Sequence, residues 1–279
     1  MTAFFDSIEI CEDEKEFTDL KAIIKKKIGF NCDEYKQAHL KRRLAARLRV
    51  NHSGSYKEYA KILLADEEES RKLKETLTVN VTELFRNPET YEAFQRVVLP
   101  ELIKAKGENM TIKVWSAGCS NGEEPYSIAI MLIEFLGILA KRYTISILGT
   151  DIDDDSLNKA ESAVFHPKQL EKIDKKRIGQ FFIKNNDNYQ LKEDIQSMLR
   201  FKHHDMISGP AMFGFDIIFC RNVTIYFDKK LQERLYLKFY DSLNDGGYFV
   251  MGKTEMLVGP ACDLFEPVSL KERIYRKIR

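Results

Sequence analysis

Glycine, proline and tryptophan are scarce in this sequence. The 279 residues include only 14 Gly, 7 Pro and one Trp. About 44% of the residues are hydrophobic and 31% are charged, which is the composition of a globular protein with a full core and excludes a disordered chain. The length exceeds that of one average domain, so we expect two domains.

Cysteine is also scarce, and its positions are scattered. The five cysteines are Cys11, Cys32, Cys119, Cys220 and Cys262. An odd number without a CxxC pair excludes a disulfide framework and a zinc cluster, and it favours a reducing compartment. We therefore expect a cytoplasmic protein. His203 and His204 are adjacent, so on a strand they point to opposite faces; with no third ligand nearby, we expect no metal.

The chain has almost no net charge and no long apolar run. Its formal net charge is +1, so it lacks the global basic character that would indicate a nucleic-acid partner. Residues 128–140 are the most apolar stretch, but Glu134 interrupts them and they fall short of the ~20 residues needed to span a bilayer. A signal peptide would need a basic start, but the N-terminus is acidic. We expect no membrane insertion.

The first third of the sequence has a helical pattern only. Apolar residues recur at three- and four-residue spacing from residue 15 to residue 78, with breaks near residues 29–32, 51–54 and 66. Ser55 and Asp66 are suited to cap the helices that follow them. The pattern predicts a bundle of about four short helices, which we assign to a domain over residues 1–88.

The remainder, residues 89–279, alternates between strand and helix patterns. Strands are predicted at residues 111–116, 144–150, 215–220 and 247–251, and helices at residues 124–141 and 228–243. Such alternation predicts a parallel sheet wrapped by helices, as in Rossmann-like α/β domains. Residues 164–204 are too long for one crossover and contain two apolar runs, 181–183 and 198–201. We expect a small inserted β-subdomain there.

Polar residues follow the predicted strands at the sheet edge where parallel sheets bind ligands. After the first strand, Gly118 and Gly122 permit close approach of a ligand to the backbone, and Glu124 begins the next helix. Acidic residues there would repel a pyrophosphate, so a cationic ligand fits better.

Asp151 follows the second strand, about 30 residues after the glycine turn. A carboxylate there is suited to accept both hydroxyls of a ribose, which NAD enzymes and S-adenosylmethionine enzymes share. The acidic first turn favours the sulfonium cofactor, whose methionyl end carries an ammonium group. The alternative is that Asp151 only caps the next helix.

The third strand leads into Arg221, Asn222 and Tyr226, three polar groups that folding does not require. Asn222 is placed to reach cofactor or substrate, and the Tyr226 hydroxyl to approach the reacting centre. The alternative is that Tyr226 is a half-buried core aromatic with one hydrogen bond.

Taken together, these motifs resemble the chemotaxis-receptor glutamate methyltransferases of the CheR family. The resemblance spans nearly the whole chain and is carried by NVTELFR at residues 80–86, GEEPYS at residues 122–127 and RNVTIYF at residues 221–227. It implies a Rossmann-like S-adenosylmethionine-dependent methyltransferase domain with an inserted β-subdomain, preceded by a helical domain that recognises the substrate. It also implies methylation of glutamate side chains on the cytoplasmic helical domain of chemotaxis receptors, with S-adenosylhomocysteine as product.

The resemblance also carries over cofactor contacts, residue by residue. They fall on Asn80, Thr82, Arg86, Glu124, Asp151, Asp205, Met206, Asn222 and Val223. The family usually has Asn at the position of Asp205 and Phe at that of Leu84. Catalytic roles are predicted for Arg86 and Tyr226, because a glutamate carboxylate is already ionised near neutral pH and needs orientation rather than a base. Arg86 would hold the carboxylate of the cofactor or of the substrate; the alternative is a surface ion pair.

A basic helix supplies the argument for the partner. Residues 36–49 contain six Lys or Arg and no acid. Lys36, Arg43 and Arg47 share one stripe beside the leucine stripe of residues 40, 44 and 48, and we predict that they bind acidic receptor helices. The alternative is an ordinary solvated face. The short turn at residues 184–189 lacks glycine, so no tethering of a receptor C-terminal peptide is predicted, and we expect a monomer.

Two other functions compete with this interpretation. A nucleic-acid methyltransferase would use the basic helix to bind phosphates, with strong salt dependence. A non-catalytic adaptor would bind receptors and use the cofactor only as a ligand. Turnover on a receptor fragment distinguishes both from a receptor methyltransferase.

Overall fold

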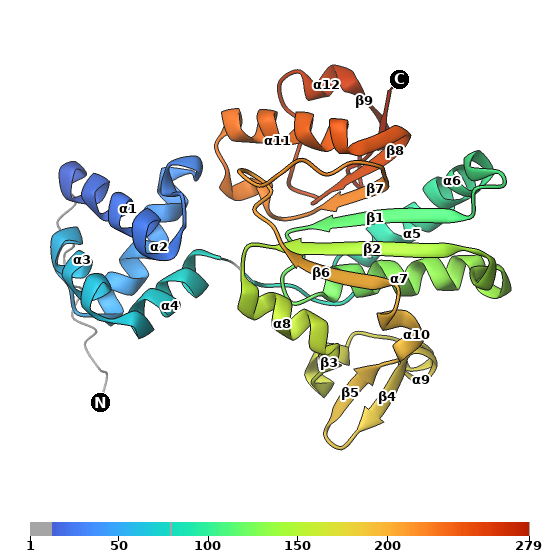
Figure 1. Cartoon of the computed structure of the whole chain (residues 1–279), viewed down its shortest axis with the longest axis horizontal. Coiled ribbons are helices and arrows are strands. Elements are labelled where there is room, and N and C mark those ends of the chain that lie inside the picture. The colour runs from blue at the N-terminus through green and yellow to red at the C-terminus, as the bar shows by residue number, and fades with distance from the viewer. Residues whose placement is uncertain (1–12, 79, 279) are drawn as a thin grey trace. The chain divides into compact units, whose positions relative to one another are not determined.

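The computed structural model describes residues 13–78 and 80–278, which form two compact units (Figure 1). Unit 1 contains residues 13–78 together with Tyr226–Asp228, and unit 2 contains Asn80–Ile225 and residues 229–278. The sequence-based boundary was at residue 88, whereas residues 80–88 lie in unit 2. Residues 1–12, which include Cys11 and the acidic N-terminal residues, lie outside the described part.

Unit 1 contains the four predicted helices. They are α1 (Glu14–Ile28), α2 (Gln37–Val50), α3 (Tyr56–Ala65) and α4 (Glu67–Leu77), with a short 3-10 turn η1 (Cys32–Glu34) between the first two. Both predicted caps are confirmed, because Ser55 accepts a hydrogen bond from the Glu58 N–H and Asp66 accepts one from the Glu68 N–H. The leucine stripe of α2 is fully buried and packs in a core with Phe17 and Tyr59.

Unit 2 is built on a sheet of seven strands in the order β6-β2-β1-β7-β8-β10-β9. The strands are β1 (Thr111–Ala117), β2 (Thr144–Asp151), β6 (Leu199–His203), β7 (Phe215–Cys220), β8 (Leu243–Met251), β9 (Phe265–Ser269) and β10 (Ile274–Lys277). The first five strands in this order run parallel, but β10 pairs antiparallel with both β8 and β9. The expectation of a parallel sheet is therefore wrong at one edge, where two C-terminal strands were not predicted.

The inserted subdomain also differs from the prediction. Its own sheet contains β3 (Val164–Phe165), β5 (Asn188–Leu191) and β4 (Phe182–Asn185). The second apolar run assigned to it, residues 198–201, instead contributes to β6. This strand pairs with β2 and is the other edge strand of the main sheet. A short apolar run indicates a buried strand but not which sheet it joins, and this is the physical reason for the error.

Helices cover both faces of the main sheet. The other helical segments of unit 2 are α5 (Pro88–Ala93), η2 (Phe94–Val98), α6 (Leu99–Lys106), α7 (Glu123–Leu136), η3 (Gly137–Arg142), α8 (Asp154–Ser162), η4 (Pro167–Leu170), α9 (Lys175–Phe181), α10 (Glu193–Gln196), η5 (Thr224–Tyr226), α11 (Lys229–Ser242) and α12 (Ala261–Leu264). Alternate residues of β1 point to opposite faces: Val114 packs in the core shared with α5–α7, whereas Trp115 contacts Phe239 of α11. Within the described residues, no helix is long and apolar enough to cross a membrane.

Candidate functional site

The turn after β1 is bound to the end of β2. The backbone N–H groups of Gly118 and Cys119 donate to the Thr150 carbonyl, at 2.8 and 2.9 Å. Gly118 has a φ of 77°, and a Cβ there would lie 2.6 Å from Cγ2 of Val223. Only glycine permits this approach, so the turn after β1 lies directly against the loop after β7, as the predicted site requires.

Asp151 is 8% exposed and lies beside this turn. Its carboxylate accepts hydrogen bonds from the N–H of Ser120 (2.8 Å) and the N–H of Asp153 (3.0 Å). Burial raises the pKa of Asp151, and these N–H bonds oppose the rise. Helix α8 is capped by Asp153 instead. The alternative in which Asp151 only caps that helix is therefore wrong.

Glu124 lies in the first turn of α7 and faces a buried arginine. Its carboxylate accepts a hydrogen bond from the Ser116 hydroxyl (2.8 Å) and pairs with Nη1 of Arg221 at 3.5 Å. The two side chains are 13% and 2% exposed. Burial raises the pKa of Glu124, whereas the charge of Arg221 lowers it. The pair therefore supplies a buried carboxylate at the carboxyl end of β1.

The same arginine holds the segment at residues 80–87. Nη2 of Arg221 donates to the Arg86 carbonyl (2.8 Å) and to Oδ1 of Asn87 (3.1 Å). Phe85 and Asn87 both have left-handed backbone conformations, with φ of 54° and 58°. The Phe85 N–H donates to the Ser127 hydroxyl (2.8 Å). Non-glycine residues in this region are strained, so several contacts are used to fix the backbone around Arg86.

The Asn80 side chain reaches the end of β2. Its amide donates to Oδ2 of Asp153 at 2.6 Å, which brings the Asn80–Arg86 segment close to the Asp151 carboxylate. The Arg86 guanidinium donates to the Val81 carbonyl (2.9 Å) and is half-buried. The surface ion pair that was the alternative for Arg86 is not among its contacts in the described structure. Thr82, in the same segment, is half-buried.

The remaining predicted cofactor residues come from two loops. Met206 is buried, and its Cε lies 3.4 Å from the position that a Cβ on Gly118 would take. Asp205 accepts bonds from the Ile207 N–H (2.8 Å) and the Ser208 hydroxyl, so its carboxylate holds its own turn. Asn222 and Val223 are half-buried, and Asn222 has a φ of 61°. The structure thus brings Glu124, Asp151, Asn80, Met206 and Val223 to one end of the sheet.

Several buried polar atoms at this end have no partner within the described protein. They include Oγ of Ser120, Oδ1 of Asn121, Oδ1 of Asn222 and Nε of Arg221. Buried polar atoms are nearly always hydrogen-bonded in folded proteins, so the three oxygens are suited to accept from a polar ligand. A nucleoside with an amino-acid tail supplies hydroxyl, amino and ammonium donors, and the residues present therefore fit S-adenosylmethionine.

Tyr226 and the basic residues of α2 belong to unit 1. The Arg43 guanidinium lies 4.5 Å from the centre of the Tyr226 ring, and the Lys36 N–H donates to the Tyr226 carbonyl (2.8 Å). Tyr226 is half-buried, as the alternative for this residue also requires. The structure groups Tyr226 with unit 1 and Arg86 with unit 2, so a joint catalytic role of the two stays a prediction.

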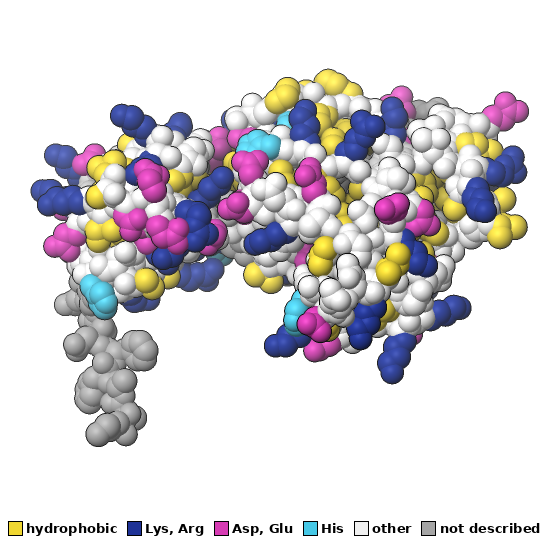
Figure 2. Space-filling model, turned by 60° about the horizontal axis from the view of Figure 1, so that its bottom comes forward, with side chains coloured by type: hydrophobic (Ala, Val, Ile, Leu, Met, Phe, Trp, Pro, Cys, Tyr) yellow, Lys and Arg dark blue, Asp and Glu magenta, His cyan; other side chains and the backbone are white. Residues whose placement is uncertain are grey.

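The predicted basic stripe of α2 is engaged inside unit 1. Arg47 forms a two-pronged ion pair with Glu69, a residue that is only 3% exposed, and Arg43 donates to the Leu77 carbonyl. The exposed cations of this helix are Lys36, Arg42 and Arg49. In Figure 2, dark-blue Lys and Arg side chains on unit 1 are interspersed with magenta Asp and Glu. Arg43 and Arg47 therefore do not form a freely open face, and their role in substrate binding stays a prediction.

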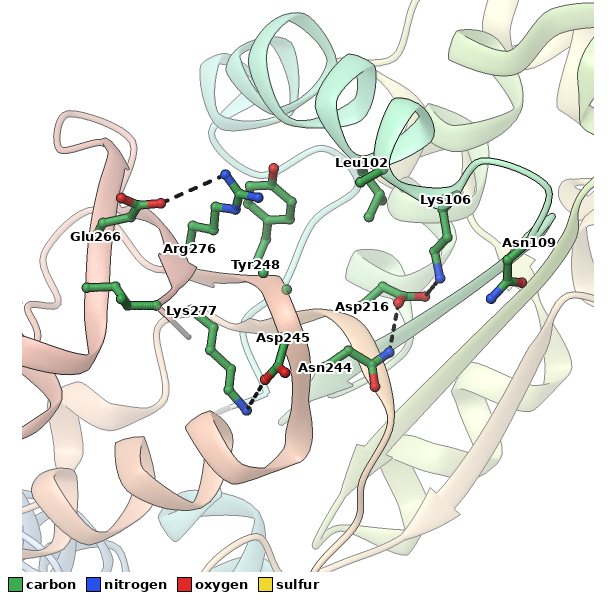
Figure 3. A pocket seen from close by; sticks show the side chains of 14 residues that line it. Leu102, Lys106, Asn109, Asp216, Asn244, Asp245, Tyr248, Glu266, Arg276 and Lys277 are labelled. Atoms are coloured by element: carbon green, nitrogen blue, oxygen red, sulfur yellow. Dashed lines mark hydrogen bonds and ion pairs between the residues drawn. The ribbon is translucent and has the colours of Figure 1, made fainter.

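A polar cavity of about 460 Å³ lies at the amino ends of β7 and β8, at the end of the sheet opposite to the site described above (Figure 3). Lys106 and Asp216 form an ion pair there at 2.7 Å, and Asp216 also accepts a bond from the Asn244 amide (2.8 Å). These residues belong to the amino ends of β7 and β8 and the end of α6, so this cavity is separate from the strand-end site. Across residues 13–78 and 80–278, no group of three or more His, Cys, Asp or Glu is arranged to hold a metal ion.

An α/β sheet with a glycine turn, a buried carboxylate at the end of β2 and unpartnered polar atoms is the arrangement of a nucleoside-cofactor enzyme. Comparison with known families defines its class. Residues 80–274 match the model described as "CheR methyltransferase, SAM binding domain", and residues 15–78 match "CheR methyltransferase, all-alpha domain". The molecule is an S-adenosylmethionine-dependent methyltransferase with a helical domain before the α/β domain, as predicted.

Relatives of the same length support this assignment. A chemotaxis protein methyltransferase of Listeria innocua is 32% identical over 89% of this chain and 92% of its own length. One from Borreliella burgdorferi is 32% identical over 91% of each chain. The chain belongs to the CheR methyltransferase family of chemotaxis methyltransferases.

Proposed function

We propose that the protein transfers the methyl group of S-adenosylmethionine to glutamate side chains on the cytoplasmic helical domain of chemotaxis receptors. The proposal rests on family membership and on one structural observation, which is the set of acidic side chains around the glycine turn. Asp151 is buried and the Glu124 side chain is only 13% exposed, both at the carboxyl end of the sheet. Such a set favours a cationic ligand with ribose hydroxyls and disfavours a dinucleotide.

The side chains at this site hold and orient, because a glutamate substrate needs no general base near neutral pH. In this proposal, Asp151 accepts the ribose hydroxyls and Glu124 accepts from the methionyl ammonium. When bound, S-adenosylmethionine supplies an activated methyl group. Arg86 is proposed to orient a carboxylate by paired hydrogen bonds. The Tyr226 hydroxyl is proposed to approach the reacting centre. The remaining predicted contacts, from Thr82, Asp205, Met206, Asn222 and Val223, are part of this proposal.

The decisive experiment incubates the protein with methyl-labelled cofactor and a receptor cytoplasmic fragment, and then treats the product with mild base. A glutamyl methyl ester releases volatile labelled methanol, whereas methylated amines and nucleic acids do not. We expect methanol release that depends on the receptor fragment. Label that is retained on nucleic acid would favour the competing nucleic-acid enzyme. Cofactor binding without any turnover would favour the non-catalytic adaptor.

For the partner, we propose that acidic receptor helices are contacted by Arg42 and Arg49 on the outward face of α2 and by the exposed Lys36 just before this helix. Arg43 and Arg47 would first have to leave their partners in unit 1. Replacing both Arg42 and Arg49 with Glu is expected to raise the KM for the receptor fragment about tenfold at low salt, and less at high salt. Steady-state kinetics at two salt concentrations measure this effect.

Arg47→Ala is the contrasting variant. It leaves the buried Glu69 carboxylate with Tyr59 as a partner (2.6 Å) but without its counter-charge. We expect it to lower the free energy of unfolding by about 2 kcal/mol, while the Arg42/Arg49 variant stays within about 0.5 kcal/mol of the parent. Urea denaturation measures both. Loss of receptor binding by Arg47→Ala without loss of stability would restore it as a substrate contact.

A further inference from the structure

The loop after β8 contains a buried carboxylate to which the sequence analysis assigned no role. Glu255 is 3% exposed, although it lies outside any helix or strand. It follows β8 by four residues, at the same end of the sheet as Asp151 and Glu124. A buried acid at such a position requires compensation for its lost hydration.

The compensation comes entirely from hydrogen-bond donors of two loops. Oε2 accepts from the N–H of Asn222 (2.8 Å) and the N–H of Gly252 (2.6 Å). Oε1 accepts from the N–H of Thr224 (2.8 Å), the Thr224 hydroxyl (2.7 Å) and the N–H of Ile225 (3.2 Å). Three of the donating residues, Asn222, Thr224 and Ile225, lie within four positions of one another in the segment that follows β7.

We propose that Glu255 is a positioning residue for the cofactor site: it holds the Asn222–Val223 loop in its binding conformation. Asn222 has a left-handed φ of 61°, which a non-glycine residue adopts only when its surroundings impose it. Glu255 fixes the N–H of that residue. On its other side, the loop packs against Gly118, where the absence of a Cβ makes room for the Val223 side chain. The loop is thus held between Gly118 and Glu255.

The packing around Gly252 supports the same inference. A Cβ on Gly252 would lie 2.6 Å from Oε2 of Glu255 and 2.8 Å from the Asn222 nitrogen. Such contacts are too short to persist, and both atoms belong to the hydrogen bond that fixes Asn222. Gly252→Ala therefore displaces the loop while the carboxylate itself remains, and it provides a second variant that is independent of Glu255→Gln.

The test compares Glu255→Gln with Asp216→Asn. Every group that hydrogen-bonds to the Glu255 carboxylate is a donor. In Glu255→Gln, the amide NH₂ replaces one of the two oxygens and therefore meets at least two N–H or O–H donors with no acceptor to offer them. Asp216 is an equivalent buried carboxylate at the opposite end of the sheet (Figure 3), where it accepts from the Lys113 N–H, Asn244 and Lys106. Its Asn variant disturbs the core to a similar degree but lies outside the cofactor site.

Calorimetric titration of the full-length variants with S-adenosylhomocysteine, below their unfolding temperatures, gives the answer. We expect Glu255→Gln and Gly252→Ala to bind at least about tenfold more weakly than the parent, with Asp216→Asn within about twofold of it. A difference of less than about fivefold between Glu255→Gln and Asp216→Asn, at equal folded fraction, overturns the inference. The inference rests on the proposed cofactor site. If the parent itself takes up no S-adenosylhomocysteine, the proposed function fails as well, whereas uptake by the parent with normal uptake by Glu255→Gln refutes this inference alone.

Discussion

Asp151→Asn is expected to weaken S-adenosylhomocysteine binding by about 100-fold or more. Each carboxylate oxygen of Asp151 already accepts one backbone N–H, from Ser120 or Asp153, and each retains a further lone pair that is available to a ribose hydroxyl. An asparagine loses one of these acceptors to the ligand and turns an NH₂ group toward a backbone donor. Two charged hydrogen bonds at about 1.5 kcal/mol each account for a change of this size.

Asp154→Asn is the matched control for this prediction. Asp154 lies three residues further along, in the first turn of α8, but its side chain is 63% exposed and pairs with His203. We expect its affinity for S-adenosylhomocysteine to remain within about twofold of the parent. Titration calorimetry of both variants measures the effect. Equal affinities for Asp151→Asn and Asp154→Asn would show that the end of β2 does not contact the ribose.

Much of the strand-end site was predictable because parallel strands place their carboxyl ends at one edge. Looking directly after each apolar run identified the turn at Gly118, Asp151 and the segment at Asn222. The rule does not reach Glu255, because a turn after β8 places this acid four residues beyond Met251 rather than directly after the strand.

The error on α2 has a geometric origin that the sequence already contains. Successive residues are rotated by about 100° around a helix, so Arg43 and Arg47 lie directly beside the leucine stripe. Residues at the border of a buried stripe are only half-exposed, and their long side chains find partners on the neighbouring helix. Arg42 and Arg49 point away from the leucines. The prediction placed Arg43 and Arg47 beside the leucines, but it did not anticipate the partners that α4 supplies there, the Leu77 carbonyl and Glu69.

Other features depend on contacts between distant segments and could not be inferred. The pairing of β6 with β2, the pairing of β10 with β8, and the ion pair of Arg47 with Glu69 all join residues far apart in the chain. Local pattern specifies that an element forms, but the choice of its neighbour is decided by tertiary packing.

Arg86→Ala is expected to lower kcat by about 100- to 1000-fold, the range found when a fixed donor is removed from a developing or reacting charge. Phe85 and Asn87, on either side of Arg86, are held in strained left-handed conformations. Arg221 and Ser127 hold this segment through the Arg86 carbonyl and the Phe85 N–H. Strain maintained by so many contacts is typical of a functional site.

Arg86→Lys separates charge from geometry, since lysine keeps the charge but lacks the planar fork that binds a carboxylate with two bonds. We expect it to recover less than about a tenth of the parent kcat. Arg96→Ala, an exposed arginine in η2 of the same unit, is the control and should retain full activity. Wild-type turnover by Arg86→Ala would remove this residue from the mechanism.

The same variant decides which carboxylate Arg86 holds. If it binds the carboxylate of the cofactor, Arg86→Ala weakens S-adenosylhomocysteine binding in calorimetry to about the same extent as it lowers kcat/KM. If it binds the glutamate of the receptor, S-adenosylhomocysteine affinity stays near that of the parent, and the loss is confined to turnover with the receptor fragment. We expect the second result, because the guanidinium is half-buried and, among the described residues, donates a hydrogen bond to the Val81 carbonyl of its own loop. Its remaining N–H donors are then available to an incoming substrate.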